Sequence, residues 1–420
     1  MKNIPLSLAL LAMTLAGCAR TVDIRTDLTP ETCVPGTVHK VERVGCYSAV
    51  TLRAMLWISD LPGKVTIKHG VRLYRVEYWT TNYDGQPTVA SGLVALPKKA
   101  APDAVVECLH GTTTLRNATP SKPTLLEGVS VSAIFAGAGY LLVMPDYIGY
   151  GTSHEMHPYL HAKTTADTSI DLLKAAHAFS GTLGVTWPTS LYLTGYSQGG
   201  HATAATQRAL EAMNDPRFQV VASAPSSGTY NLADLIFPFA LEGKSSAHSL
   251  YLAFMVRAYS AIYQQPIESV IKEEYAVLLP VLYDGEHDGG PIMEALPRNP
   301  RDMFQKTFLD DYDNGRPTWL LTALRENETY QWTPKAPMHV YYGESDTDVS
   351  PKESIEAAAE WTKRGANVQL INLGDFNHEG AIFQSVPLIR KWFDEVRAQQ
   401  KAGEKAAQGL KTLRPAYAAR

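Results

Sequence analysis

Short apolar segments alternate with helical segments over much of the chain, and this alternation limits the fold more than any other feature. Each strand-like run is short and apolar, and the segment after it has apolar residues at helical spacing. This pattern is typical of a parallel sheet covered by helices. The runs are 104–109, 140–145, 190–195 and 219–224, and the helical segments between them are 125–137, 163–180 and 198–213.

The alternation stops after residue 231 and resumes near residue 331. Residues 232–330 contain long helical patterns and no clear strand, so we expect a mostly helical cap insertion there. The sequence therefore predicts one α/β domain in two parts, 70–231 and 331–400. The other elements expected are a hairpin of 71–80 and 88–97, strands at 337–342 and 367–373, and helices at 352–364 and 380–399.

The N-terminal segment has the pattern of an export signal. Lys2 precedes an apolar run that ends in "LAGC" at Cys18, and this run is too short for a typical membrane span. "LAGC" resembles the bacterial lipobox, which implies a signal peptide of residues 1–17 and a lipid on Cys18. An ordinary signal peptide with an incidental Cys18 is the alternative. Ala19 favours sorting to the outer membrane, so we expect an exported, membrane-anchored lipoprotein.

The two flanks of the domain are less regular. Residues 18–69 are mixed and interrupted by Pro and Gly, which indicates a tether with a small N-terminal elaboration, and 401–420 are interpreted as a flexible tail. Disulfides persist in exported proteins, so we expect a bridge between Cys33 and Cys46. Cys108 lies in a strand-like run and is interpreted as a buried small side chain.

Charge and composition exclude some classes of partner. Charged residues make up 19% of the chain, its formal net charge is −4, and no long basic run occurs in the domain. Nucleic acid is therefore not expected as a partner. No Cys/His spacing indicates a metal site, and the chemistry proposed below requires no cofactor.

A serine lies between glycines where a strand gives way to a helix. The residues Gly195-Tyr196-Ser197-Gln198-Gly199 follow the run at 190–195 and open the helix at 198–213. This is the context of a nucleophile elbow, in which a strained turn presents the serine hydroxyl. A flexible turn without a catalytic role is the alternative interpretation of these residues.

A serine nucleophile requires a base and an acid later in the chain. His378 follows the last strand-like run and is the candidate base. The loop "YYGESDTDVSP" supplies the acid, and we select Asp346, with Asp348 as the alternative. His201 and His339 are interpreted as packing or surface residues.

The oxyanion of the reaction requires two N–H donors. The backbone N–H of Gln198 is one candidate. The other lies in "HGT" after the run at 104–109, and we favour the N–H of Thr112, with Gly111 as the alternative. A simple strand-ending turn at His110-Gly111 is the structural alternative.

Several stretches together resemble the secretory lipase family. They are "MPDYIGYGTSHEMHPYL" (144–160), "GYSQGGHATAA", "TPKAPMHVYYGESDTDVSP" and "NHEGA". The resemblance implies an α/β-hydrolase fold and a serine lipase or esterase acting on acylglycerols or other carboxylic esters. Asp146 of the first stretch precedes the serine, so it is interpreted as a structural hydrogen-bond acceptor.

The leading hypothesis is therefore an ester hydrolase whose Ser197 forms an acyl-enzyme. A peptidase of the prolyl-oligopeptidase type is a second hypothesis, although no room for a propeller exists before residue 70. A non-catalytic binding lipoprotein on a hydrolase scaffold is the third. Apolar segments of the cap, such as "LIFPFAL" and "LYLAFMVRAY", could form an acyl-chain pocket or only pack the cap helices together.

Overall fold

A single mixed sheet organises the computed structural model, which describes residues 33–58, 65–122 and 127–413. The strand order is β1-β2-β3-β5-β4-β6-β7-β8-β9. The strands are β1 (Val38–Tyr47), β2 (Val71–Thr81), β3 (Pro87–Pro97), β4 (Val105–Leu109), β5 (Leu141–Pro145), β6 (Ser190–Tyr196), β7 (Gln219–Ser226), β8 (Met338–Tyr342) and β9 (Val368–Asn372).

The sheet is antiparallel at one side and parallel over the rest. β1, β2, β3 and β5 pair antiparallel in that order. All pairs from β5 through β4, β6, β7 and β8 to β9 are parallel. The predicted mostly parallel sheet, the hairpin and all the expected strands are confirmed. The strong β-branched and aromatic content of these runs explains why they form strands.

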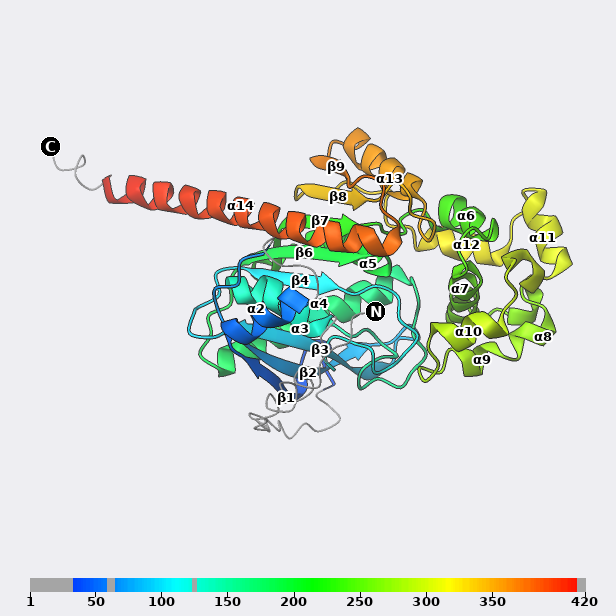
Figure 1. The fold of residues 1–420 in the computed structure, drawn as a ribbon, viewed down its shortest axis with the longest axis horizontal. Coiled ribbons are helices and arrows are strands. Elements are labelled where there is room, and N and C mark those ends of the chain that lie inside the picture. Colours follow the sequence, from blue (N-terminus) through cyan, green and yellow to red (C-terminus); the bar gives the residue numbers. More distant parts are fainter. Residues whose placement is uncertain (1–32, 59–64, 123–126, 414–420) are drawn as a thin grey trace.

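Helices cover both faces of this sheet (Figure 1). α4 and α5 pack on one face, where α13 joins them through a cluster that includes Ala204 and Trp361. α3 and α14 cover the other face through a cluster that includes Phe135 and Phe393. The helices of the domain are α2 (Ala49–Ile58), α3 (Gly128–Phe135), η3 (Ala136–Ala138), α4 (Ala162–Thr182), α5 (Gln198–Met213), η4 (Pro216–Phe218), α13 (Pro351–Lys363) and α14 (His378–Leu413).

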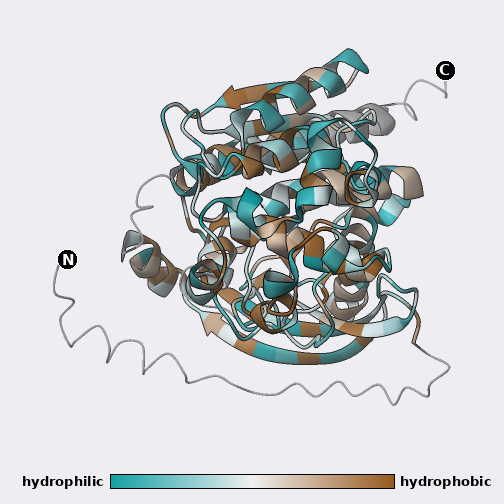
Figure 2. Ribbon diagram, turned by 90° about the vertical axis from the view of Figure 1, so that its right-hand side faces the viewer, coloured by the Kyte–Doolittle hydropathy of each residue, from teal (hydrophilic) through white to brown (hydrophobic). Residues whose placement is uncertain are grey.

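The segment between β7 and β8 forms helices at one end of the sheet (Figure 1). Seen from that side, these helices carry both hydrophobic and hydrophilic residues, as is typical of helices with one buried face (Figure 2). Apolar residues of "LIFPFAL" and "LYLAFMVRAY" lie together in one buried cluster. The elements are η5 (Leu232–Ile236), α6 (Phe237–Leu241), α7 (His248–Ile262), η6 (Ile267–Ser269), α8 (Glu273–Ala276), α9 (Leu279–Leu282), α10 (Gly289–Ala295), η7 (Pro300–Met303), α11 (Lys306–Asp313) and α12 (Trp319–Glu326).

Two parts of the chain are more regular than the sequence indicates. The predicted tether and elaboration contain β1 and α2, and β1 extends the antiparallel side of the sheet. The last helix continues to Leu413, so residues 401–413, expected as part of a flexible tail, are helical. Within the described part of the chain, no helix has the combination of length and apolar character that crossing a membrane requires. The predicted signal peptide and Cys18 lie outside the described residues.

The predicted disulfide between Cys33 and Cys46 is wrong, because both cysteines are free. Cys33 precedes β1, whereas Cys46 lies near the other end of this strand, opposite Arg72. From Val38 to Cys46 an extended strand covers roughly 26 Å at about 3.3 Å per residue. A disulfide needs Cα atoms within about 7 Å of each other. The extended strand therefore keeps the two thiols apart.

Candidate active site

Ser197 occupies a strained backbone conformation between a strand and a helix. Its φ is 60° and its ψ is −120°, and it lies between the last residue of β6 and the first residue of α5. A side chain held at positive φ costs free energy, and such strain is concentrated at functional sites. The backbone N–H of Ser197 donates to Ser226 O at 3.0 Å, which ties the turn to β7. The predicted strand-turn-helix context is confirmed.

The glycines of the turn are required by close backbone contacts. A Cβ on Gly195 would lie 2.2 Å from the carbonyl oxygen of Gly199. A Cβ on Gly199 would lie 1.9 Å from the carbonyl oxygen of Leu109 at the end of β4. Both distances are far below van der Waals contact, so no side chain fits at either position. The glycines allow α5 to begin directly against the sheet.

Asp346 and His378 are paired. Asp346 Oδ2 lies 2.7 Å from His378 Nδ1, and the Asp346 side chain is 1% exposed. The other carboxylate oxygen, Oδ1, accepts from the backbone N–H groups of Asp348 at 3.0 Å and Val349 at 2.9 Å. These two bonds fix the carboxylate in its loop and leave Oδ2 for the imidazole. Asp346 therefore sets the orientation of the His378 ring.

The other acidic residues of this loop have different neighbours. Asp348 Oδ2 accepts from the Tyr251 hydroxyl at 3.4 Å. Glu344 is exposed, and its carboxylate accepts from the Asn372 side chain at 2.5 Å. Of the three carboxylates, only Asp346 has a hydrogen bond to His378 within the described part of the chain.

Ser197 and His378 open onto the same cavity, which has a volume of about 510 Å³. The ring of Tyr196 lies 4.9 Å from the ring of His378, and its hydroxyl donates to the His378 carbonyl oxygen. The residue next to Ser197 in sequence thus holds the first turn of α14. This contact brings the end of strand β6 next to the start of helix α14, where Ser197 and His378 line the cavity.

The candidate oxyanion loop lies beside the serine. A Cβ on Gly111 would lie 3.8 Å from Ser197 Cβ, and both Gly111 and Thr112 line the cavity. The Thr112 hydroxyl lies 3.1 Å from the Tyr159 hydroxyl, which links this loop to the stretch at 144–160. Gln198 begins α5, and the first N–H groups of a helix have no partner within the helix.

The stretch at 144–160 holds the candidate oxyanion loop through several contacts. Tyr147 donates through its hydroxyl to His110 O at 3.2 Å, and Tyr150 donates to Thr113 O. Asp146 accepts from the Ser121 backbone N–H at 2.8 Å and from the Ser91 hydroxyl at 2.6 Å, which confirms its structural role.

His157 is a residue that the sequence analysis does not single out. Its Nδ1 donates to Ile148 O at 2.8 Å, so its Nε2 can accept from Gln198 Nε2, which is also 2.8 Å away. Burial lowers the pKa of His157 to about 3 and keeps the ring neutral, as this pair of bonds requires. His157 therefore fixes the side chain of the first residue of α5. Its place within the shared stretch "SHEMHPYL" was the signal that could have revealed it.

The walls of the cavity come mainly from helices α3 and α14, which lie on the same face of the sheet. Strands β4 and β6 also contribute lining residues. The helical insertion contributes one lining residue, Tyr251 of α7. Most apolar residues of the insertion segments pack the insertion helices together, and the segment "LYLAFMVRAY" reaches this cavity through Tyr251.

The remaining predicted residues lie away from the reaction centre or are unreactive. Cys108 lines the cavity, and burial raises the pKa of its thiol, so it stays protonated and is a poor nucleophile. His201 is buried and donates to Asn327 O at 2.9 Å. His339 stacks on Trp392 with ring centroids 3.6 Å apart. Among the described residues no group of three or more His, Cys, Asp or Glu side chains could hold a metal ion.

The sheet order, the strained serine at the β6–α5 turn and the histidine at the start of α14 define the α/β-hydrolase fold. Residues 119–278 match the family model described as secretory lipase, which confirms the resemblance to this family of carboxylic ester hydrolases. No curated protein matches the sequence.

Solved structures of bacterial proteins are similar over nearly the whole domain. A protein of Legionella pneumophila is 28% identical, with a TM-score of 0.81, over 86% of this chain and 98% of that chain. The rice cell wall degrading esterase LipA from Xanthomonas oryzae is 26% identical, with a TM-score of 0.79, over 87% of this chain and 100% of that chain. Candida antarctica lipase A shares the fold at 15% identity and a TM-score of 0.63, over 83% of this chain and 79% of that chain.

Proposed function

We propose that the protein is a serine hydrolase that cleaves carboxylic esters through an acyl-enzyme on Ser197. The observation that carries this proposal is the buried Asp346–His378 pair beside a strained serine that opens onto the same cavity. The likeness to secretory lipases and to the LipA esterase supports the choice of esters as substrates. A strained serine with an oriented histidine supplies the nucleophile and base that acyl transfer requires.

Each residue has a defined role in the proposed reaction. Asp346 holds the proton of His378 on Nδ1, so Nε2 is free to take the proton of the Ser197 hydroxyl. The serine oxygen bonds to the acyl carbon, and the bond from that carbon to the alcohol oxygen breaks as His378 gives its proton to the leaving alcohol. Water then donates a proton to His378, attacks the acyl-enzyme and releases the acid, and the proton returns to Ser197.

The negative oxygen of the two tetrahedral intermediates needs fixed N–H donors. We assign this role to the backbone N–H groups of Gln198 and Thr112, with Gly111 as the alternative to Thr112. Loss of one such donor typically costs about 3–4 kcal/mol of transition-state stabilisation. Tyr159 contacts Thr112, His157 contacts Gln198, and Tyr147 bonds to His110 O next to Gly111, which supports the assignment, since a donor acts best when it is held in place.

The experiment compares the full-length protein with Ser197→Ala. The wild type should react with a fluorophosphonate probe and should hydrolyse p-nitrophenyl butyrate, whereas Ser197→Ala should do neither. Unlabelled wild-type protein would point instead to a binding protein on a hydrolase scaffold. Cleavage of a proline-containing peptide with no cleavage of esters would favour a peptidase.

We also propose that the chain is exported and anchored by a lipid on Cys18. The lipobox resemblance of "LAGC" supports this proposal, and the likeness to the secretory lipase family is in accord with export. Cells grown with an alkyne-labelled fatty acid should incorporate the label into the wild type and not into Cys18→Ser. Equal labelling of both forms would rule out the anchor.

A further inference from the structure

The cavity beside Ser197 is a pocket within the hydrolase domain. α3 contributes Val131, Ile134 and Phe135 to one wall, and α14 contributes Ile382 and Val386 to the other. Its volume of about 510 Å³ lies within the range of small-molecule sites. Walls of this kind favour an aliphatic chain, because contact with them removes apolar surface from water.

Ser197, His378 and Gly111, on which the proposed function rests, line this cavity. An acyl group bonded to the Ser197 oxygen would therefore have the apolar part of the cavity within reach. The inference developed here takes the proposed ester hydrolysis as given and concerns the chemistry of the acyl chain.

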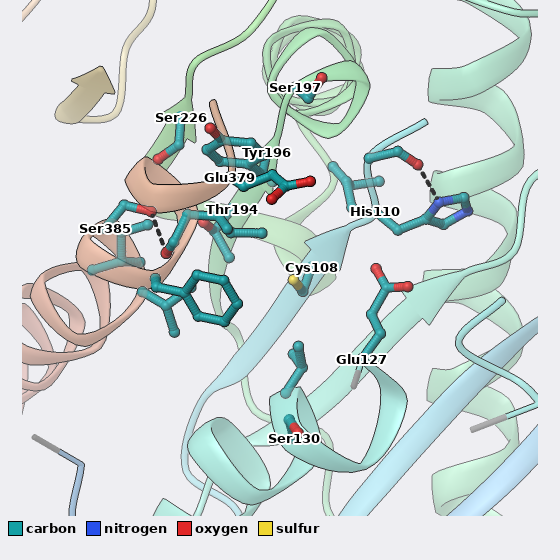
Figure 3. A pocket seen from close by; sticks show the side chains of 18 of the residues that line it. Cys108, His110, Glu127, Ser130, Thr194, Tyr196, Ser197, Ser226, Glu379 and Ser385 are labelled. Carbon is teal, nitrogen blue, oxygen red and sulfur yellow. Dashed lines mark hydrogen bonds between the residues drawn. The ribbon is translucent and has the colours of Figure 1, made fainter. Parts of the chain in front are cut away.

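Glu127 places a carboxyl group in the same wall as Ser130 and the apolar side chains of α3. It is the residue before α3, yet its side chain makes no capping hydrogen bond to that helix. Figure 3 shows this side chain extending from the start of α3 into the space between Cys108 and His110. The side chain is partly exposed and lines the cavity. Burial raises the pKa of the Glu127 carboxyl, and the nearby His110 opposes this shift.

A plain alkyl chain in the cavity would reduce the access of this carboxyl to water and would offer it no hydrogen bond. A buried polar group of this kind is costly unless a hydrogen bond compensates it. A hydroxyl group on the acyl chain can form this hydrogen bond in both protonation states of Glu127, since it donates to a carboxylate and accepts from a carboxylic acid. An ammonium group would serve only the carboxylate, and the apolar walls would oppose the entry of its charge.

We propose that Glu127 selects esters whose acyl chain carries a hydroxyl group, bound in the cavity between α3 and α14. Sites built to bond a substrate hydroxyl discriminate strongly against analogues that lack it, because a buried polar group of the protein is then left unpaired. Glu127 is thus a specificity-determining residue, and hydroxyacyl esters are the substrate class.

The test measures kcat/KM of the full-length protein for methyl octanoate and for its 3-, 6- and 8-hydroxy derivatives. The wild type should prefer at least one hydroxy ester by about tenfold or more, which is the effect of one hydrogen bond to a charged group. Glu127→Leu should abolish this preference, so that kcat/KM for the hydroxy esters falls to that for methyl octanoate. Glu127→Gln should keep most of the preference, because an amide still accepts and donates.

A matched control uses Glu379, an exposed carboxylate that also lines the cavity. Glu379→Leu should leave the ratio between hydroxylated and plain esters unchanged, whatever its effect on overall rate. A ratio that is equal in the wild type and Glu127→Leu would overturn the inference while ester hydrolysis itself stands. A Glu127-dependent preference for 8-amino over 8-hydroxy esters would also overturn it. Absence of hydrolysis of every ester would instead refute the proposed function.

Discussion

Replacement of Asp346 by asparagine tests the reasoning about the site most directly. We expect Asp346→Asn to fold normally and to lower kcat for ester hydrolysis by about four orders of magnitude, the loss typical of this change in serine hydrolases. The two side chains have nearly the same shape, so the effect depends on hydrogen-bond direction alone. The structure indicates which direction the asparagine would adopt.

The amide has one oxygen for the two positions that the Asp346 oxygens occupy. Oδ1 accepts from the N–H groups of Asp348 and Val349, at 3.0 and 2.9 Å. If the amide oxygen keeps this place, the NH₂ group faces His378 Nδ1, which must then accept. The ring proton moves to Nε2, and that nitrogen can no longer take the proton of Ser197.

The opposite orientation of the amide is disfavoured. It would direct the NH₂ group at two N–H donors and leave both without an acceptor, at a cost of about 1–3 kcal/mol each. The asparagine should therefore select the unproductive tautomer. A loss of four orders of magnitude corresponds to about 5.5 kcal/mol in the activation free energy, at about 1.36 kcal/mol for each tenfold change.

The assay is the hydrolysis of p-nitrophenyl butyrate at saturating substrate, with thermal melting to verify the fold. Asp348→Asn is the control and should keep kcat within a few-fold of the wild type, because Asp348 faces Tyr251. The reasoning is refuted if Asp346→Asn keeps kcat within tenfold of the wild type while melting at the same temperature. Loss of activity in Asp348→Asn alone would assign the acid to Asp348.

Three further changes test other parts of the site and the fold. Gly199→Ala brings a Cβ to 1.9 Å from Leu109 O, so it should lower the free energy of unfolding by more than about 3 kcal/mol, measured in urea; near-wild-type stability would contradict the close contact. His157→Leu removes the acceptor of the Gln198 side chain and should lower kcat roughly 10- to 100-fold with little change in KM. Because the pKa of His157 is lowered to about 3, this loss should be the same from pH 5 to 9, and a loss that varies with pH would argue against it. Burial raises the pKa of Glu328 from 4.5 to about 7, so the folded state binds this proton more tightly than the unfolded state, and stability should fall as the pH rises through that window. Glu328→Gln should remove this decline and gain up to about 3 kcal/mol at pH 8, and equal pH profiles of the two proteins in urea unfolding would show that Glu328 does not cause it.

The parts of the fold that follow a local rule were predictable. The helix at 198–213 begins and ends as expected, and the strands of the parallel region differ from their predicted limits by one or two residues. The pairing of Asp346 with His378 was predictable because each residue follows a strand, and the carboxyl ends of parallel strands meet at one edge of the sheet. Asp346 and His378 follow β8 and β9, which are neighbours.

Strand β1 was not predicted from the sequence because its pairing with β2 is irregular. Its register with β2 shifts between Val38 and Lys40 and again between Arg43 and Gly45. Each such irregularity disturbs the alternation of inward and outward side chains on which strand prediction depends.

The length of α14 was underestimated for a different reason. Its distal residues are polar, which indicated a frayed end, but many are alanine, lysine, glutamate or glutamine, which are good helix formers.

The cavity could not be predicted, because its two walls are far apart in the chain. α3 supplies one wall near residue 131, α14 supplies the other near residue 386, and no local pattern relates the two segments. Their positions follow from the sheet, which brings β4 beside β6 and so sets α3 and α14 on the same face. The helical insertion touches the cavity through Tyr251. Selectivity for the acyl chain should therefore respond to substitutions in α3 and α14 more than to changes within the insertion core.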